Sequence, residues 1–285
     1  MEFLDAYETP IRLSAFLGIL ALMATLEGLW PRRTREQTRL RRWATNMGMV
    51  VIDTLALRLV FSVLAVGVAA MATERGWGLF GLLNWPVWLE IVLSVILLDL
   101  LIYGQHVASH RIPLLWRFHR VHHTDRDFDV TTALRFHPAE IVFSMGVKFA
   151  GIVLLGAPAL AVFIFEVLLN GAAMFNHANL GIPAKLDRFL RQVIVTPDMH
   201  RVHHSVVQRE TDSNFGFCLS AWDRLFRTYR AQPEAPHDQM QIGLAEFQDN
   251  SPGKLWWSLW LPFHRSERHG SQLPSPEAAQ PTQAE

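Results

Sequence analysis

Long apolar segments constrain the fold of this chain more than any other feature of its sequence. Half of the 285 residues are apolar, and they gather in runs at residues 13–30, 47–72, 88–103 and 141–175. A helix needs about 20 apolar residues to cross the ~30 Å hydrocarbon core of a bilayer, and the runs are near or above that length. Ten tryptophans and eighteen phenylalanines suit a protein with aromatic side chains at the membrane interface. The sequence predicts an all-α integral membrane protein.

The orientation follows from the segment between the first two runs, which carries Arg32, Arg33, Arg35, Arg39, Arg41 and Arg42. Short loops rich in Lys and Arg stay in the cytoplasm. We therefore expect the amino terminus on the periplasmic or lumenal side and the end of the third run at the cytoplasmic face. No cleavable signal peptide is evident, because the first run follows acidic residues instead of a basic segment. We expect the first helix to act as its own insertion signal.

The last apolar run, residues 141–175, holds Gly156-Ala157-Pro158 near its middle. A single span would place the histidines that follow it across the membrane from those that precede it. A helical hairpin bent at Gly156–Pro158 keeps them together, with two arms of about 16 residues as short spans or a re-entrant pair. We predict about four transmembrane helices, the last two as a short hairpin, with a cytosolic helical cap.

Three short clusters contain eight of the thirteen histidines: His106 and His110; His119, His122 and His123; and His200, His203 and His204. Residues three or four apart share a helix face, so each cluster can direct its imidazoles at one point. Eight ligands exceed the need of one ion, which favours a two-metal centre. Imidazole suits iron, zinc and copper, so the ligand type alone does not name the metal.

The chain resembles the fatty acid hydroxylase/sterol desaturase superfamily of membrane histidine-box enzymes from about Asp99 to Tyr229. The resemblance rests on Trp-Arg-Phe-His-Arg-Val-His-His at 116–123, Thr-Ala-Leu-Arg-Phe-His-Pro-Ala-Glu at 132–140, Phe-Asn-His-Ala-Asn at 175–179 and Thr-Pro-Asp-Met-His at 196–200, closed by Asp-Ser-Asn-Phe-Gly at 212–216 and Trp-Asp-Arg-Leu-Phe at 222–226. The Thr-Ala-Leu-Arg segment is most similar to alkylglycerol monooxygenase-like bacterial members.

This resemblance implies a cytosolic di-iron site with His177 as a ninth ligand. It also implies O₂ as co-substrate and a lipid substrate taken from the bilayer. Ligating imidazoles need partners at their second nitrogen, and we place Asp99, Asp212 and Asn179 near the ligands in that role. His137 before Pro138 reads as a helix start, with a structural or supporting role.

The predicted function is an O₂-dependent lipid hydroxylase acting on a sterol, fatty acyl or ether lipid. A desaturase with the same site is the first alternative, because both reactions begin with the same hydrogen abstraction. A histidine-rich membrane protein that binds or transports metal is the second. The His-Glu-x-x-His motif of zinc hydrolases is absent from the sequence. The chain also lacks a Gly-rich dinucleotide motif, so electrons must come from a cytochrome b5-like, ferredoxin or NAD(P)H reductase partner, or from a reduced pterin. Zinc can replace iron during purification.

The remaining features of the sequence concern charge, cysteine content, domain extent and cellular location. Zero formal net charge gives no indication of nucleic acid binding, and the lone Cys218 cannot form an internal disulfide. We expect one membrane-embedded domain over residues 1–265, in a bacterial inner membrane or the endoplasmic reticulum, with residues 255–263 lying in the interface. We expect a disordered tail at 266–285. His237, His264 and His269 are expected to be solvent-exposed.

Overall fold

The computed structural model describes residues 2–83 and 85–264, whose regular secondary structure consists of helices and short 3₁₀ turns. The helices of the first part are α1 (Glu2–Leu29), α2 (Arg39–Val60), α3 (Ala65–Glu74), α4 (Leu79–Leu83), α5 (Val87–Arg111), α6 (Pro113–His123), α7 (Pro138–Leu155) and α8 (Ala159–Asn176). They are followed by α9 (Ala184–Leu190), α10 (Pro197–His203), α11 (Gln208–Thr211), α12 (Ala221–Leu225) and α13 (Leu255–Trp260). The 3₁₀ turns are η1 (Val130–Leu134), η2 (Ala245–Phe247), η3 (Ser251–Gly253) and η4 (Leu261–Phe263).

Five helical stretches among the described residues are long and apolar enough to cross a membrane: Ala6–Leu29, Arg39–Leu83, Val87–Arg111, Pro138–Leu155 and Ala159–Asn176. Their outer faces keep large apolar side chains exposed; Leu59 is 88% exposed and Leu154 is 73% exposed. Water would disfavour such a surface, whereas lipid tails match it. The chain is therefore an integral membrane protein, and the predicted number of about four spans is one too low.

The undercount comes from the hairpin. Its arms are α7 and α8, each of 18 residues, which extend ~27 Å and can cross a bilayer separately. The turn lies where the sequence predicted it, because Gly156 ends α7 with a left-handed φ of 68° that favours glycine. Pro158 then caps the start of α8.

The predicted span over residues 47–72 falls within one candidate span, Arg39–Leu83, but it is not one unbroken helix. Helix α2 ends at Val60, where Phe61 is extended, and α3 begins at Ala65. Apolar composition cannot distinguish one long helix from two. The small buried residues Ala65, Ala69 and Ala72 let α3 pack closely on α7 and α8, which a straight continuation of α2 would prevent.

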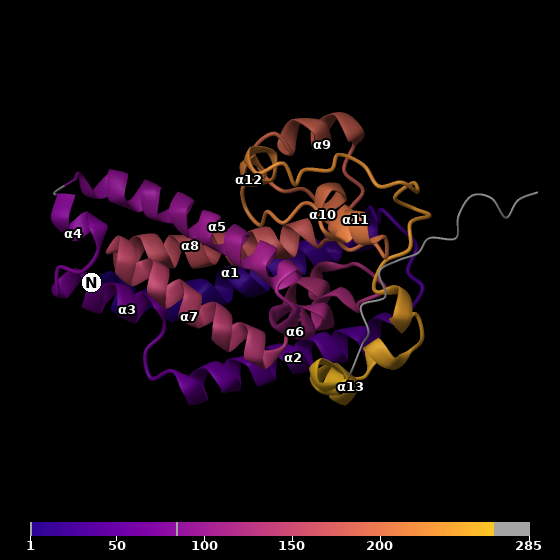
Figure 1. The fold of residues 1–285 in the computed structure, drawn as a ribbon, viewed down its shortest axis with the longest axis horizontal. Helices are drawn as coiled ribbons and strands as arrows, with labels where there is room; N and C mark the ends of the chain where they lie inside the picture. The colour runs from indigo at the N-terminus through magenta and orange to yellow at the C-terminus, as the bar shows by residue number, and fades with distance from the viewer. Residues whose placement is uncertain (1, 84, 265–285) are drawn as a thin grey trace, which may run out of the picture.

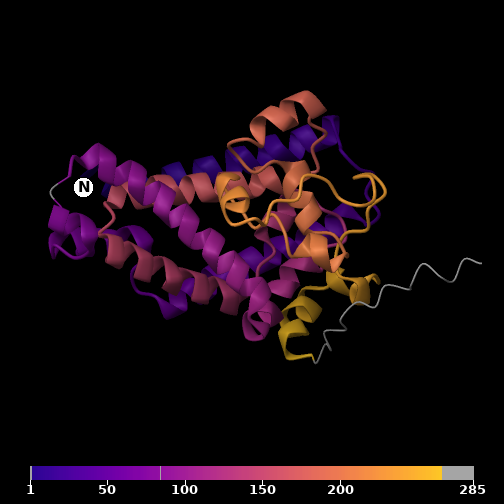
Figure 2. The ribbon, with the colours of Figure 1, turned by 45° about the horizontal axis from the view of Figure 1, so that its top comes forward.

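The long helices run side by side along the long axis of the molecule, and α9 to α13 gather at one end (Figures 1 and 2). The amino terminus marks the opposite end (Figure 1). The bundle core lies between α3, α5, α7 and α8, around buried Leu98, Ile152 and Phe165. The chain thus brings the carboxyl ends of α5 and α8 and the whole of α6 to the end covered by the cap.

The segment after the cap returns to the bundle. Helix α13 packs against α2, and η4 packs against α6. Trp256 and Trp260 of α13 are 73% and 60% exposed, which suits the predicted interfacial role. The predicted disordered tail at 266–285 lies outside the described residues.

Candidate metal centre

Nine buried histidines meet at the capped end of the bundle. His106 and His110 lie in the last turns of α5, His177 directly follows α8, and the other six come from α6 and from α10 with its C-cap. Their ligand atoms form two groups: His106, His110, His119, His123 and His203, and His122, His177, His200 and His204. Within each group the atoms lie within 4.8 Å of one another. All three sequence clusters and the isolated His177 therefore converge on one place.

The imidazoles point their Nε2 atoms at one another. In the first group His119 Nε2 lies 3.2 Å from both His106 Nε2 and His123 Nε2. In the second group His177 Nε2 lies 3.1 Å from His122 Nε2 and from His200 Nε2. Two nitrogens each ~2.0–2.1 Å from one ion and at right angles would be ~3 Å apart. The spacing matches neighbouring ligands of a shared ion.

The burial of these rings also suits ligation. Burial lowers the pKa of His177 to about 4 and that of His203 to about 3. Both rings are therefore neutral at physiological pH, and neutral imidazole is the metal-binding form. Within the described part of the chain, His203 Nε2 and both ring nitrogens of His204 are buried without a hydrogen-bond partner. Such atoms are costly unless a ligand satisfies them, so the residues fit a pair of metal ions.

Four of the rings are oriented through Nδ1. The carboxylate of Glu140, in the first turn of α7, lies 2.6 Å from His119 Nδ1. Backbone carbonyls do the same for three others: Phe215 O for His106, Ser213 O for His203 and Ala173 O for His177, each at 2.7 Å. An Nδ1–H bond to an oxygen leaves Nε2 as the lone-pair nitrogen, which fixes the tautomer needed for ligation.

Two aspartates hold the loop that supplies the carbonyls of Ser213 and Phe215. Asp223 accepts from the amides of Phe215 and Gly216, 2.8 and 2.9 Å away. Asp99, one of the predicted supporting residues, accepts from the amides of Cys218 and Leu219 and from the indole of Trp222. Asp99 of α5 is therefore paired with the segment at residues 218–222, and it holds the loop that carries the carbonyl partners of His106 and His203.

The other two predicted supporting residues have different surroundings. Asp212 Oδ1 lies 3.4 Å from His110 Nδ1, in position to orient that ring. Asn179 exchanges hydrogen bonds with the backbone of Arg33, and its own amide donates to Glu27. Asn179 thus ties the segment after His177 to the arginine-rich segment.

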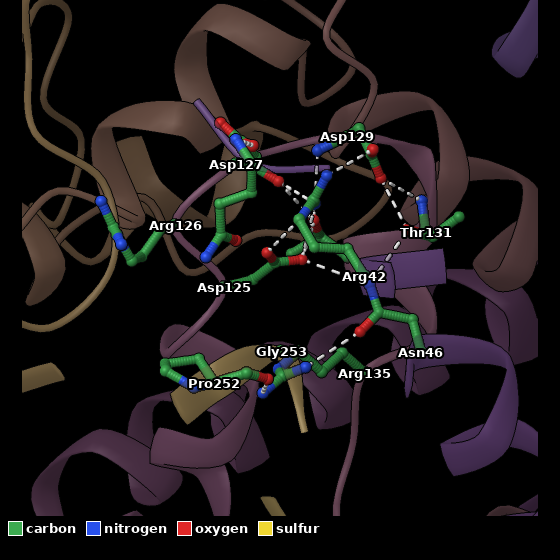
Figure 3. A network of polar contacts seen from close by, with 12 residues as sticks. Arg42, Asn46, Asp125, Arg126, Asp127, Asp129, Thr131, Arg135, Pro252 and Gly253 are labelled. Carbon is green, nitrogen blue, oxygen red and sulfur yellow. Dashed lines mark hydrogen bonds and ion pairs between the residues drawn. The ribbon is translucent and has the colours of Figure 1, made fainter. Parts of the chain in front are cut away.

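A buried polar network fixes the segment that follows His119, His122 and His123 to α2 (Figure 3). Arg42 donates two hydrogen bonds to Asp125, at 2.7 and 2.8 Å, and one to Asp129 at 2.8 Å. Although burial opposes ionisation, the Arg42 guanidinium lowers the pKa of Asp125 to about 2. Asn46 bridges Asp125 and Arg135, whose guanidinium also donates to carbonyls and hydroxyls around it. The network anchors the chain immediately after His123 and explains the polar residues between the cluster and α7.

Other singled-out residues lie outside the centre. His137 Nδ1 caps α7 by accepting from the amide of Ala139, so its role is structural. Glu166 of α8 is also outside the centre, because it pairs with Lys148 at 2.6 Å and with Arg12. The expected exposure of His237 is wrong: the ring is 4% exposed, and its Nε2 lies 3.7 Å from Asp198. Its segment folds back over the cap, which sequence polarity does not show. His264 is exposed as predicted, whereas His269 lies outside the described residues.

An apolar cavity of about 260 Å³ leads to the first histidine group. His106 and His119 line it at the metal end, and Phe16, Leu57 and Leu169 are among its apolar walls. These walls come from α1, α2 and α8, which are candidate membrane spans, with α5 and α7 completing the lining. The cavity therefore lies between membrane helices and ends at the candidate metal centre.

Sequence reasoning missed Glu140 as a supporting residue of the centre, and it did not show what Asp223 contacts. Glu140 follows the His-Pro helix start and faces back across the loop to His119. The local signal was a carboxylate in the first turn of a helix that leaves the site. Asp223 lies in the closing Trp-Asp-Arg motif, and its partners are backbone amides that carry no side-chain signature.

The fold and the site together define a membrane-helical protein with a buried centre of nine histidines suited to two metal ions. Residues 91–228 match the fatty acid hydroxylase family. Over these residues the chain is similar to the histidine-box oxidoreductases of this family, so the resemblance predicted from the sequence is confirmed.

Similar proteins of known name support the same family match. An ornithine lipid hydroxylase from Rhizobium tropici is 27% identical over 225 residues, covering 76% of this chain and 66% of the relative. Human alkylglycerol monooxygenase is 29% identical over 170 residues, covering 55% of this chain and 35% of the relative. Human cholesterol 25-hydroxylase is 25% identical over 147 residues, covering 50% and 51%. The chain spans about one third to two thirds of these relatives' lengths. No solved structure matches significantly.

Proposed function

We propose that this protein is an O₂-dependent lipid hydroxylase with a di-iron centre, acting on a C–H bond of a membrane lipid. The observation that carries the proposal is the apolar cavity between membrane helices that ends at two groups of buried histidines. An unactivated C–H bond belongs to an apolar part of a lipid, and such a cavity can receive it from the bilayer and keep water away.

His106, His110, His119, His123 and His203 would hold one iron, and His122, His177, His200 and His204 the other. When bound, the pair of irons supplies redox change and O₂ activation, which zinc cannot supply. The protein positions the ligands and the substrate, and it excludes water from the site. Glu140 and the carbonyl of Phe215 hold His119 and His106, the two rings that also line the cavity.

The reaction would place one oxygen atom of O₂ in the C–H bond and release the other as water, using two electrons and two protons. The electrons come from a separate donor, a reductase system or a reduced pterin. The names of the relatives indicate hydroxylation of ornithine lipids, alkylglycerols and cholesterol, which favours a hydroxylase over a desaturase here. The sterol, fatty acyl and ether lipid classes remain candidate substrates.

The orientation proposed from the sequence accords with the fold. The arginine-rich segment before α2 lies at the same end of the bundle as the histidines, opposite the amino terminus (Figure 1). The basic segment would hold this end in the cytoplasm, where reduced electron carriers are available.

The test compares lipids of cells with and without the protein, together with iron content and O₂ consumption of the purified protein. A lipid that gains the mass of one oxygen atom supports the hydroxylase, and one that loses two hydrogens supports the desaturase. A protein that binds metal and yields neither product would leave the metal-binding or transport alternative. The variant His203→Ala serves as the matched inactive control.

A further inference from the structure

One carboxylate in the cavity wall has no role in the centre described above. Asp53 lies on α2, ~21 Å along the helix from Arg39, inside a candidate membrane span. Its side chain is 92% buried, given a relative exposure of 8%, and it lines the cavity that leads to His106 and His119. An ionisable residue at this depth is costly, and its presence points to a functional partner.

That partner is absent from the described residues. Asp53 Oδ1 is buried without a hydrogen-bond partner there, and no ion pair in the described part of the chain includes Asp53. The other carboxylate in the cavity, Glu140, presents a similar atom: its Oε1 binds His119, while its Oε2 is buried without a partner among the described residues. Two unpartnered acceptor oxygens thus belong to residues that line one apolar cavity.

The cation of the same cavity is already engaged. Lys148 lines the cavity, but its Nζ lies 2.6 Å from Glu166 Oε1, and Glu166 also pairs with Arg12. An anionic group entering the cavity would bring only acceptor atoms to the two unpartnered acceptor oxygens, and it would find Lys148 already paired. A group that donates hydrogen bonds would satisfy the free oxygens.

We propose that Asp53 is a specificity-determining residue that binds a hydrogen-bond-donating group of the lipid substrate, a hydroxyl or an ammonium, and disfavours an anionic group. The inference rests on the proposed function, because it takes the cavity to be the substrate site. The lipid would be held at two points, by Asp53 through its polar group and by the apolar walls through its chain. This fixes which carbon lies beside the histidines.

The experiment measures binding without turnover. The full-length, metal-loaded protein in lipid nanodiscs is titrated in the absence of O₂ with hexadecylglycerol ether, hexadecylamine and hexadecyl sulfate, which differ only in the polar group. The wild type should bind the ether and the amine on the order of 10-fold or more tightly than the sulfate. Equal or tighter binding of the sulfate would overturn the proposal.

Two variants separate the donor groups. Asp53→Leu should weaken both the ether and the amine by about 10- to 100-fold, the worth of a hydrogen bond to a charged group. Asp53→Asn keeps an acceptor oxygen without the charge, so it should weaken the amine strongly and the ether little. If Asp53→Leu fails to fold, the amine affinity of Asp53→Asn decides. Wild-type affinity for both donor probes in the folded variants refutes the role of Asp53.

The matched control is Thr73→Val on α3, outside the residues that line the cavity. Its hydroxyl already donates to the carbonyl of Ala69 at 3.0 Å, so all three affinities should stay unchanged. The result is independent of the proposed chemistry. Donor selectivity without any oxidised product would refute the hydroxylase and keep the binding role, whereas a hydroxylase without donor selectivity would refute only the binding role.

Discussion

Removing the Glu140 carboxylate should weaken metal binding without unfolding the protein. Glu140 Oε1 lies 2.6 Å from His119 Nδ1, with the two residues only 7% and 2% exposed. A buried hydrogen bond to a charged group contributes about 1.5–3 kcal/mol, which corresponds to a factor of about 10 to 100 in the dissociation constant. Glu140→Ala should therefore weaken iron binding by that factor, in the range found for partners of ligating histidines.

The Gln variant sharpens this expectation. Glu140→Gln keeps an acceptor oxygen but loses the charge, and a neutral hydrogen bond is about half as strong as a charged one. Its loss should be about 3- to 10-fold, between the wild type and Glu140→Ala. The affinity is measured by titrating the purified protein with a chelator in the absence of lipid, so that the place of Glu140 in the cavity wall does not contribute.

The control is Glu74→Gln at the exposed end of α3, which should leave iron affinity unchanged. A purely structural role for Glu140 would lower the unfolding temperature of the metal-free protein and the iron affinity together, in the same order for both variants. If Glu140→Ala binds iron like the wild type, the carboxylate does not orient His119 and the reasoning from its geometry is wrong.

Four further outcomes are expected. His203→Ala removes a buried ring from the first group, so metal per chain should fall and product formation should cease, and full activity would contradict the ligand assignment. Burial lowers the pKa of His203 from 6.5 to about 3, so the unfolded state takes up more protons in acid. The unfolding temperature of the metal-free protein should therefore hold above pH 6.5 and decrease as pH falls towards 3, and a flat profile would count against the burial of neutral rings. Arg42→Met leaves buried Asp125 without its cation and should cost about 3–5 kcal/mol of stability, seen as a lower denaturation midpoint. Reporter fusions after Gln192 and after Gly270 should both read cytoplasmic, and a non-cytoplasmic result at both sites would disprove the hairpin topology.

The sequence predicted the parts of the site that depend on local spacing. Histidines three and four residues apart share a face wherever a helix forms, so one helix sufficed to bring His119, His122 and His123 to the centre. The expectation that each cluster meets at a single point is wrong, because His122 lies in the second ligand group and the other two lie in the first. The prediction of the hairpin also depended on neighbouring residues, because Gly156 ends one helix and Pro158 begins the next. These features follow from a few neighbouring residues, and the structure has them where the pattern indicates.

The parts that sequence reasoning missed depend on contacts between distant segments. The break between α2 and α3 reflects packing of Ala65 and Ala69 against α7 and α8, to which composition is blind. His237 was expected to be exposed because its neighbours are polar, yet its segment folds over the cap beside Asp198. Glu140 reaches His119 across a loop, and this pairing becomes visible only once α6 and α7 are placed together.

The distribution of the histidines across the chain has a consequence for how the protein matures. The rings come from both the membrane bundle and the cap, from His106 to His204. A complete metal centre therefore exists only after the last cluster has been synthesised and all the spans have inserted. Because metal binding is coupled to folding, iron would join the cap to the bundle as the final step of biogenesis. In iron-starved cells the chain would accumulate with a loosened cap, exposed to membrane proteases, so iron supply would set its abundance as well as its activity.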